Sequence, residues 1–222
     1  MNIHPSELLQ RLNPFDPKYR YHFIHIPKNG GVSVRRALRR IRYVSVSKPY
    51  HYRYVDIADK VGRELQFFCI VRNPWSRTAS RYEFARQSSI KWPHDDPRRI
   101  YISKATFEDF VRDQRKLPIP KHPEQPWMGP MNSWFNHLEW ITDEEGKVAC
   151  DCLRLENLTD DLEEYFQRKI DLPRRNVTRK QYDYRAMYSD ELAEIVATTF
   201  EDDIEYFGFD FESAATRNIA VR

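Results

Sequence analysis

The sequence predicts an α/β protein in which helices flank a central, mostly parallel sheet in three layers. Two nearly continuous apolar runs, residues 21–26 and 66–71, have the composition of strands that are buried on both faces. Each run is followed by a turn and then by apolar residues at helical spacing. Strands that alternate with helices pair in parallel, so ligands are expected beyond the carboxyl ends of these strands.

The first half of the chain contains one βαβ unit and the start of a second strand–helix pair. After the strand at 21–26, a loop leads into a helix with apolar residues every three or four positions, and then into a β-rich run at 43–46. The second apolar strand ends before Asn73 and Pro74, a capping residue followed by proline at the first helical position. Both strand-to-helix turns therefore lie at the same edge of the predicted sheet.

The second half contains an irregular segment between regular elements. A capped helix is predicted over 106–114, but residues 117–130 contain five prolines and can form neither a helix nor a central strand. This proline-rich loop is either an interdomain linker or, as its aromatic content favours, an ordered loop over the functional site. The remaining predicted elements are a strand at 148–154, a helix at 158–166 and a final helix from Ser189 to near Gly208.

The composition is that of a soluble globular protein. The chain has 222 residues, 41% apolar and 31% charged, with a mean hydropathy of −0.77. These values argue against disordered, collagen-like and membrane-spanning classes and favour a single domain over 1–222, with 1–18 as an N-terminal extension. No apolar run approaches the ~18 residues of a membrane span and no signal-peptide pattern is present, so we expect a cytoplasmic protein.

The three cysteines are expected to be buried thiols. Cys69, Cys150 and Cys152 are an odd number and do not form a disulfide framework. Cys150 and Cys152 would share one face of a strand, where a metal pair is an alternative, but buried thiols are several-fold more common. We therefore predict no metal.

Charge is strongly segregated along the chain, although the net charge is only +3. Between Lys18 and Tyr54 there are ten Lys and Arg residues and no Asp or Glu. This basic region is expected to attract anions, although individual arginines on a surface helix are as often only solvated. Residues 190–212 contain nine acids and no cation, and they are expected to form a solvated helical face.

The loop after the first strand, His25-Ile-Pro-Lys-Asn-Gly-Gly-Val-Ser33, has the features of a phosphate or sulfate cradle. Backbone N–H groups at a helix N-terminus attract anions, and glycines let the main chain approach them closely. Lys28 adds a positive charge and Ser33 a hydroxyl. The predicted fold is thus P-loop-like, but Lys28 precedes Gly30 and Gly31 instead of following them, which excludes a Walker-type nucleotide triphosphate loop.

Two motifs in this order resemble those of sulfotransferases that use 3′-phosphoadenosine 5′-phosphosulfate (PAPS) as co-substrate. The loop at 25–34 resembles their 5′-phosphosulfate loop, and Ile70-Val-Arg-Asn-Pro-Trp-Ser-Arg-Thr-Ala-Ser-Arg-Tyr82 resembles their 3′-phosphate segment. The similarity is closest to the carbohydrate or Golgi-type branch (sulfotransferase family 2-like). It implies an enzyme that moves the sulfonate group of PAPS to a hydroxyl or amine of an acceptor, either a glycan or a small hydroxylated molecule.

The resemblance implies a role for residues of both motifs. Lys28 would bridge the 5′-phosphate and the transferring sulfonate, Arg72 and Ser80 would hold the 3′-phosphate, and Arg179 or Lys180 would lie on the adenine side. The amide cradle around the sulfonate would comprise Asn29, Gly30, Gly31, Val32 and Ser33.

Val32 departs from the family pattern, because this position usually carries threonine. The change removes one hydroxyl from the sulfonate cradle, so a fold that binds PAPS without turnover stays open as an alternative. On the helix after Arg72, Ser80 is expected to share a face with Arg77. We interpret Arg77 and Arg81 as surface cations, whereas an arginine that ends an apolar strand, as Arg72 does, is costly unless an anion meets it.

The family reaction is an in-line attack of the acceptor on sulfur, for which a base must accept the acceptor proton. Lys28 and backbone amides suit the stabilisation of the leaving phosphate, so no metal is needed. His51 is the candidate base because it follows the second strand at the same edge and histidine titrates near neutral pH, although a surface histidine is an equal alternative. We interpret His25 as structural, and His122 and His137 as substitutes for His51 if the proline-rich loop covers the acceptor.

Two other function classes stay open on the sequence. A P-loop-like, nucleotide-dependent phosphotransferase or kinase would share the anion cradle but would need magnesium ligands and prefer ATP. A non-enzymatic nucleic-acid binder would use the arginine-rich helix between Arg35 and Arg42, but the slight net charge argues against nucleic acid as a partner.

Overall fold

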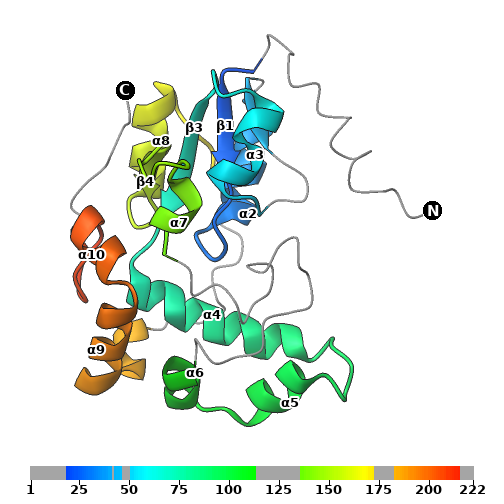
Figure 1. The fold of residues 1–222 in the computed structure, drawn as a ribbon, viewed down its shortest axis with the longest axis vertical. Coiled ribbons are helices and arrows are strands. Elements are labelled where there is room, and N and C mark those ends of the chain that lie inside the picture. The colour runs from blue at the N-terminus through cyan, green and yellow to red at the C-terminus, as the bar shows by residue number, and fades with distance from the viewer. Residues whose placement is uncertain (1–18, 42, 47–50, 114–135, 173–182, 216–222) are drawn as a thin grey trace. The chain divides into compact units, whose positions relative to one another are not determined.

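The structure is a computed structural model that describes residues 19–41, 43–46, 51–113, 136–172 and 183–215 (Figure 1). The chain divides into two compact units. The first unit comprises Met1–Val71, His137–Asn176 and Asn218–Arg222, and the second comprises Arg72–Asn136 and Val177–Arg217. Several features predicted from the sequence lie outside the described residues, namely the N-terminal extension, the proline-rich loop with His122, Arg179 and Lys180.

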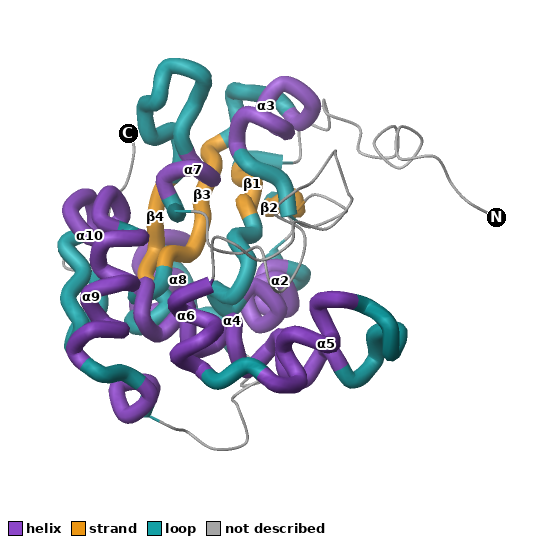
Figure 2. Tube along the Cα trace, turned by 60° about the horizontal axis from the view of Figure 1, so that its bottom comes forward, coloured by secondary structure: helices purple, strands orange, loops and turns teal. Residues whose placement is uncertain are grey.

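The first unit contains a four-stranded sheet in the order β2-β1-β3-β4. The central pair is β1 (Tyr21–Ile24) and β3 (Gln66–Val71); β2 (Val44–Val46) pairs with β1, and β4 (Asp151–Arg154) pairs with β3. All three pairings are parallel, and Figure 2 shows the strands side by side in orange. The prediction of a parallel sheet is confirmed.

Helices cover both faces of this sheet. On one face, α2 (Gly31–Leu38) and α8 (Leu158–Phe166) pack against the strands. On the other face lies α3 (Tyr54–Val61). The ring centroid of Tyr54, its first residue, is 4.8 Å from that of Phe67, and α3 also contacts α7 (Leu138–Ile141). The α2–α8 face forms a continuous core of buried side chains: Phe23, Val34, Ala37, Leu38, Ile41, Val44, Phe68, Ile70, Leu153, Leu162, Phe166 and Ile170.

The helix α3 was not predicted, and a local polar contact explains its start. The Asp56 carboxylate accepts from the Arg53 backbone N–H at 3.1 Å and from the Arg53 guanidinium at 3.0 and 3.1 Å. Arginine is not among the usual capping residues, so this start carries no standard signal in the sequence.

The three cysteines lie in the core of the first unit. All are free and fully buried, and the sulfur atoms of Cys69 and Cys152 on neighbouring strands are 3.7 Å apart. Burial raises the pKa of the Cys69 and Cys150 thiols, which disfavours the thiolate form that reacts and binds metals. The interpretation of the cysteines as buried thiols is confirmed.

The described residues of the second unit form helices and the loops between them, and no strand. Its first helices are α4 (Pro74–Ser89), α5 (Pro97–Lys104) and α6 (Phe107–Asp113). The unit also contains three later elements, the short 3₁₀ helix η1 (Tyr184–Met187), α9 (Asp190–Thr199) and α10 (Glu201–Phe207). No helix in the described part of either unit is long and apolar enough to cross a membrane.

The predicted final helix is two helices. Phe200 separates α9 from α10 with φ −117° and ψ 29°, which interrupts the helical backbone. Its ring is fully buried, so the break turns an apolar side chain into the core of the unit. The predicted end is confirmed, because Gly208 closes α10 in the left-handed conformation with φ 67°.

Candidate anion-binding segments

The loop between β1 and α2 has an unusual backbone. Lys28 and Gly30 have φ of 68° and 72°, in the left-handed region that glycine tolerates and lysine rarely adopts. Non-glycine residues keep such a conformation only where the surroundings impose it, and they cluster at binding sites. The strained lysine is the one that the sequence assigns to an anion.

Three packing contacts impose this loop conformation. The Asn29 side chain is buried, and its amide donates to the carbonyl of Ile70 on β3 at 2.6 Å. A Cβ at Gly30 would lie 2.6 Å from Leu155, and a Cβ at Gly31 would lie 1.8 Å from Nε2 of His25. Gly31 is therefore required by space and Gly30 by its left-handed backbone, and the Asn29 side chain holds the loop on the sheet.

The start of α2 presents main-chain donors and no acid. Gly30 caps the helix, and its carbonyl accepts from Ser33 and Val34 at 3.0 and 3.3 Å. The N–H groups of Gly31 and Val32, the first two residues of the helix, have no carbonyl acceptor within the helix, as in any helix N-terminus. Val32 is 39% exposed and Ser33 is half-buried. This arrangement of amides, a lysine and a hydroxyl suits a phosphate or sulfate group.

His51 lies against the same loop. Its ring centroid is 4.4 Å from that of His25, and its Nδ1 is 2.9 Å from the His25 carbonyl oxygen. A carbonyl only accepts, so Nδ1 carries the proton and, in the neutral ring, Nε2 carries the lone pair of a base. Burial, together with the charge of Arg35, lowers the pKa of His51, while the hydrogen bond to His25 raises it. The half-buried position argues against the alternative of a surface histidine.

His25 fits the structural role predicted for it. It is buried, and burial, His51 and Arg35 together lower its pKa to about 2. Arg35 was not singled out from the basic run, yet its Nε lies 3.4 Å from the Gly31 carbonyl and its charge acts on both imidazoles. Its neighbours Arg36 and Arg39 are exposed. The one sequence signal that distinguishes Arg35 from Arg36 and Arg39 is its position four residues after Gly31, on the same face of the helix.

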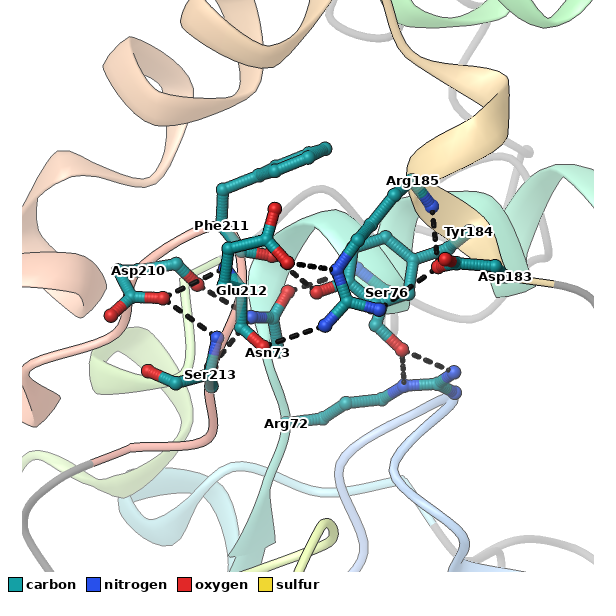
Figure 3. Close-up of polar contacts among 10 residues, drawn as sticks. All are labelled: Arg72, Asn73, Ser76, Asp183, Tyr184, Arg185, Asp210, Phe211, Glu212 and Ser213. Carbon is teal, nitrogen blue, oxygen red and sulfur yellow. Dashed lines mark hydrogen bonds and ion pairs between the residues drawn. The ribbon is translucent and has the colours of Figure 1, made fainter.

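The second segment begins at Arg72, the residue after β3. In the second unit, the Nε and Nη2 atoms of Arg72 donate to the hydroxyl of Ser76 at 3.0 and 2.8 Å (Figure 3). Ser76 was not predicted, although it precedes Ser80 by one helical turn on α4. Ser80 itself is half-buried. The guanidinium of Arg72 is thus directed along the α4 face that carries both serines.

A buried asparagine fixes this segment. The Asn73 side chain caps α4 by accepting from the Ser76 N–H at 3.1 Å, as predicted. Its amide also donates to the carbonyls of Asp210 and Ser213 at 2.8 and 2.9 Å (Figure 3). These two carbonyls belong to a local turn in which the Asp210 carboxylate accepts from the Ser213 N–H. The hydrogen bonds that this carboxylate accepts lower the pKa of Asp210.

The interpretation of Arg77 and Arg81 as surface cations is wrong. Both side chains are fully buried, between α4 and the aromatic residues of neighbouring helices. The Arg77 guanidinium lies 6.0 Å from the Phe200 ring centroid, and that of Arg81 lies 5.6 Å from the Phe110 ring centroid. Arginine is mostly exposed in proteins, so the residue type at these two positions gave no indication of burial.

The structure thus groups the predicted residues into two sets. The first unit brings Lys28, Ser33 and His51 to one loop, and the second unit holds Arg72 and Ser80 on one segment. His137, the substitute base, is fully buried, and within the described residues no group of three or more His, Cys, Asp or Glu side chains could hold a metal.

No protein-family model matches this chain, and a search of curated proteins found no match to it either.

Gly31→Ala tests the packing of the loop. The added Cβ would overlap the His25 imidazole, so we expect a loss of about 1–3 kcal/mol in the free energy of unfolding, measured by urea denaturation. In a His25→Ala background the same substitution should cost less than about 1 kcal/mol. An equal cost in both backgrounds would contradict the contact.

The buried histidines predict a pH-dependent stability. Burial lowers the pKa of His22 to about 3, and that of His25 is lowered to about 2. Below pH 6.5 the unfolded chain binds protons that the folded rings do not, so the free energy of unfolding should fall by about 3 kcal/mol from pH 7.5 to 5.5 for these two residues. His22→Gln should reduce this dependence by about half, whereas the same change at the exposed His94 should not. A stability that is equal at both pH values would refute the prediction.

Proposed function

We propose that this protein is a PAPS-dependent sulfotransferase with a P-loop-like fold. The observation that carries the proposal is the β1–α2 loop, where a lysine in the left-handed conformation and two glycines form the turn and the His51 ring packs against His25. The four-stranded parallel sheet supports it, because the loop follows the carboxyl end of β1, where such sheets bind ligands.

The residues of each segment fit the groups that PAPS would bring. Glycines that allow close approach, helix N-terminal amides and Lys28 suit the 5′-phosphosulfate. Arg72, with the hydroxyls of Ser76 and Ser80 along α4, suits the 3′-phosphate, since a guanidinium and hydroxyls are donors only toward a phosphate dianion. PAPS would supply the sulfonate and the bisphosphate leaving group.

His51 is proposed to accept the proton of the acceptor. As the acceptor oxygen forms its bond to sulfur, the bond between sulfur and the 5′-phosphate oxygen breaks, and the acceptor proton passes to Nε2 of His51. The hydrogen bond from Nδ1 to His25 fixes the tautomer, and the lowered pKa keeps His51 neutral at pH 7. Lys28 would stabilise the charge that grows on the leaving phosphate. The acceptor class, a glycan or a small hydroxylated molecule, rests on the sequence resemblance alone.

Nucleotide selectivity tests the proposal. Adenosine 3′,5′-bisphosphate should raise the melting temperature of the wild type by several degrees more than AMP, or ATP with magnesium, because binding to the native state stabilises it. Arg72→Ala should lose this selective shift. Arg86→Ala, which removes an exposed arginine from the same helix, should keep it. A preference for ATP with magnesium would contradict the proposal and favour a kinase.

Base catalysis by His51 has a separate test. With radiolabelled PAPS as donor and chondroitin or 4-nitrophenol as acceptor probes, His51→Gln should lower kcat by about 10²–10⁴-fold. Its affinity for adenosine 3′,5′-bisphosphate should stay within about twofold of wild type, because the base does not bind the nucleotide. Unchanged kcat in this variant would remove His51 from the mechanism.

A further inference from the structure

Arg81 on α4 is the buried charge that the proposed function leaves unexplained. Its side chain is fully buried, and within the part of the chain that the structure describes its Nε, Nη1 and Nη2 atoms have no hydrogen-bond partner. An arginine carries five N–H donors and stays protonated in proteins. A guanidinium in this setting has lost its hydration without the compensation that buried charges ordinarily have.

The surroundings of Arg81 add positive charge and aromatic surface. The ring of Phe110 on α6 lies 5.6 Å from the guanidinium carbon, which is the geometry of a cation–π contact. Arg77, one turn earlier on α4, is also fully buried. Burial and the charge of Arg77 both lower the pKa of Arg81, and only the Tyr188 hydroxyl acts in the opposite direction.

Four acids on α6 and α9, two helices that pack against α4, have other described partners. Glu108 on α6 and Glu191 on α9 both bind Arg112. Asp109 accepts from Thr106, and Asp113 accepts from the Tyr101 hydroxyl at 3.1 Å. No carboxylate of the described residues forms an ion pair with Arg81. The buried guanidinium of Arg81 therefore has no ion-pair partner among the described residues.

We propose that Arg81 binds an oxyanion at a site separate from the 3′-phosphate contacts assigned to Arg72 and Ser80. Adjacent helical residues point about 100° apart, so Ser80 and Arg81 leave α4 in different directions. Arg72 is already directed at Ser76. The planar guanidinium matches two oxygens of a carboxylate, sulfate or phosphate. The oxyanion is either a free inorganic ion or the acid group of an acceptor such as a uronic acid.

Thermal melting with matched variants tests this site. In the wild type, sodium sulfate or sodium glucuronate should raise the melting temperature above that in sodium chloride at equal ionic strength. Arg81→Met, which replaces the charge with apolar volume, should remove this difference. Arg86→Met changes the same charge on the exposed part of α4 and should respond like the wild type, which accounts for general salt effects. Should Arg81→Met not fold, Arg81→Lys, which lacks the planar fork, should weaken the response at least threefold.

The outcomes of this experiment distinguish the two sources of the oxyanion, and they separate failure of this site from failure of the proposed function. A response to sulfate identifies a free inorganic ion, and one to glucuronate alone identifies an acid group of the acceptor. An anion response that persists in Arg81→Met, or no response in the wild type, overturns the proposal. So does a response confined to adenosine 3′,5′-bisphosphate, because Arg81 would then belong to the nucleotide contacts. Because sulfate and glucuronate binding do not require PAPS, the site can fail or hold independently of the proposed function.

Discussion

The contact between Gly31 and the imidazole of His25 is the constraint on which the β1–α2 loop depends. A side chain at Gly31 would occupy the space of Nε2, so the first turn of α2 can lie on the ring only with glycine there. The same imidazole packs against the ring of His51 at an interplanar angle of 42°, and the carbonyl of His25 accepts a hydrogen bond from His51 Nδ1. His25 therefore acts twice: its ring restricts the start of α2 to glycine, and its carbonyl sets the tautomer of the candidate base.

Both candidate anion-binding segments are held by a buried asparagine. Asn29 fixes the first loop through the carbonyl of Ile70, and Asn73 fixes the start of α4 through one N–H and two carbonyls. A primary amide offers two donors and an acceptor in a compact group, so it satisfies main-chain atoms where no regular ladder is present. The two asparagines, and not the charged residues Lys28 and Arg72, therefore bind these main-chain atoms.

The strands, the two strand-to-helix turns and the Asn73 cap could be predicted because apolar runs, glycine and capping residues carry local signals. The sequence could not show that Arg77 and Arg81 are buried, since burial depends on α6 and α9, which lie far along the chain. It also missed Ser76 and Arg35, whose roles follow from contacts four residues apart. Phe200 divides the last helix because its ring is drawn into the core, a tertiary effect that overrides local propensity.

The most direct test of the central claim is a calorimetric comparison of adenosine 3′,5′-bisphosphate with its 2′,5′ isomer. The two ligands have the same charge and composition and differ only in where the phosphate stands on the ribose, so general attraction to the basic region cancels. The account predicts that the 3′,5′ isomer binds at least about tenfold more tightly, a difference of about 1.4 kcal/mol. Equal dissociation constants for the two isomers would contradict it.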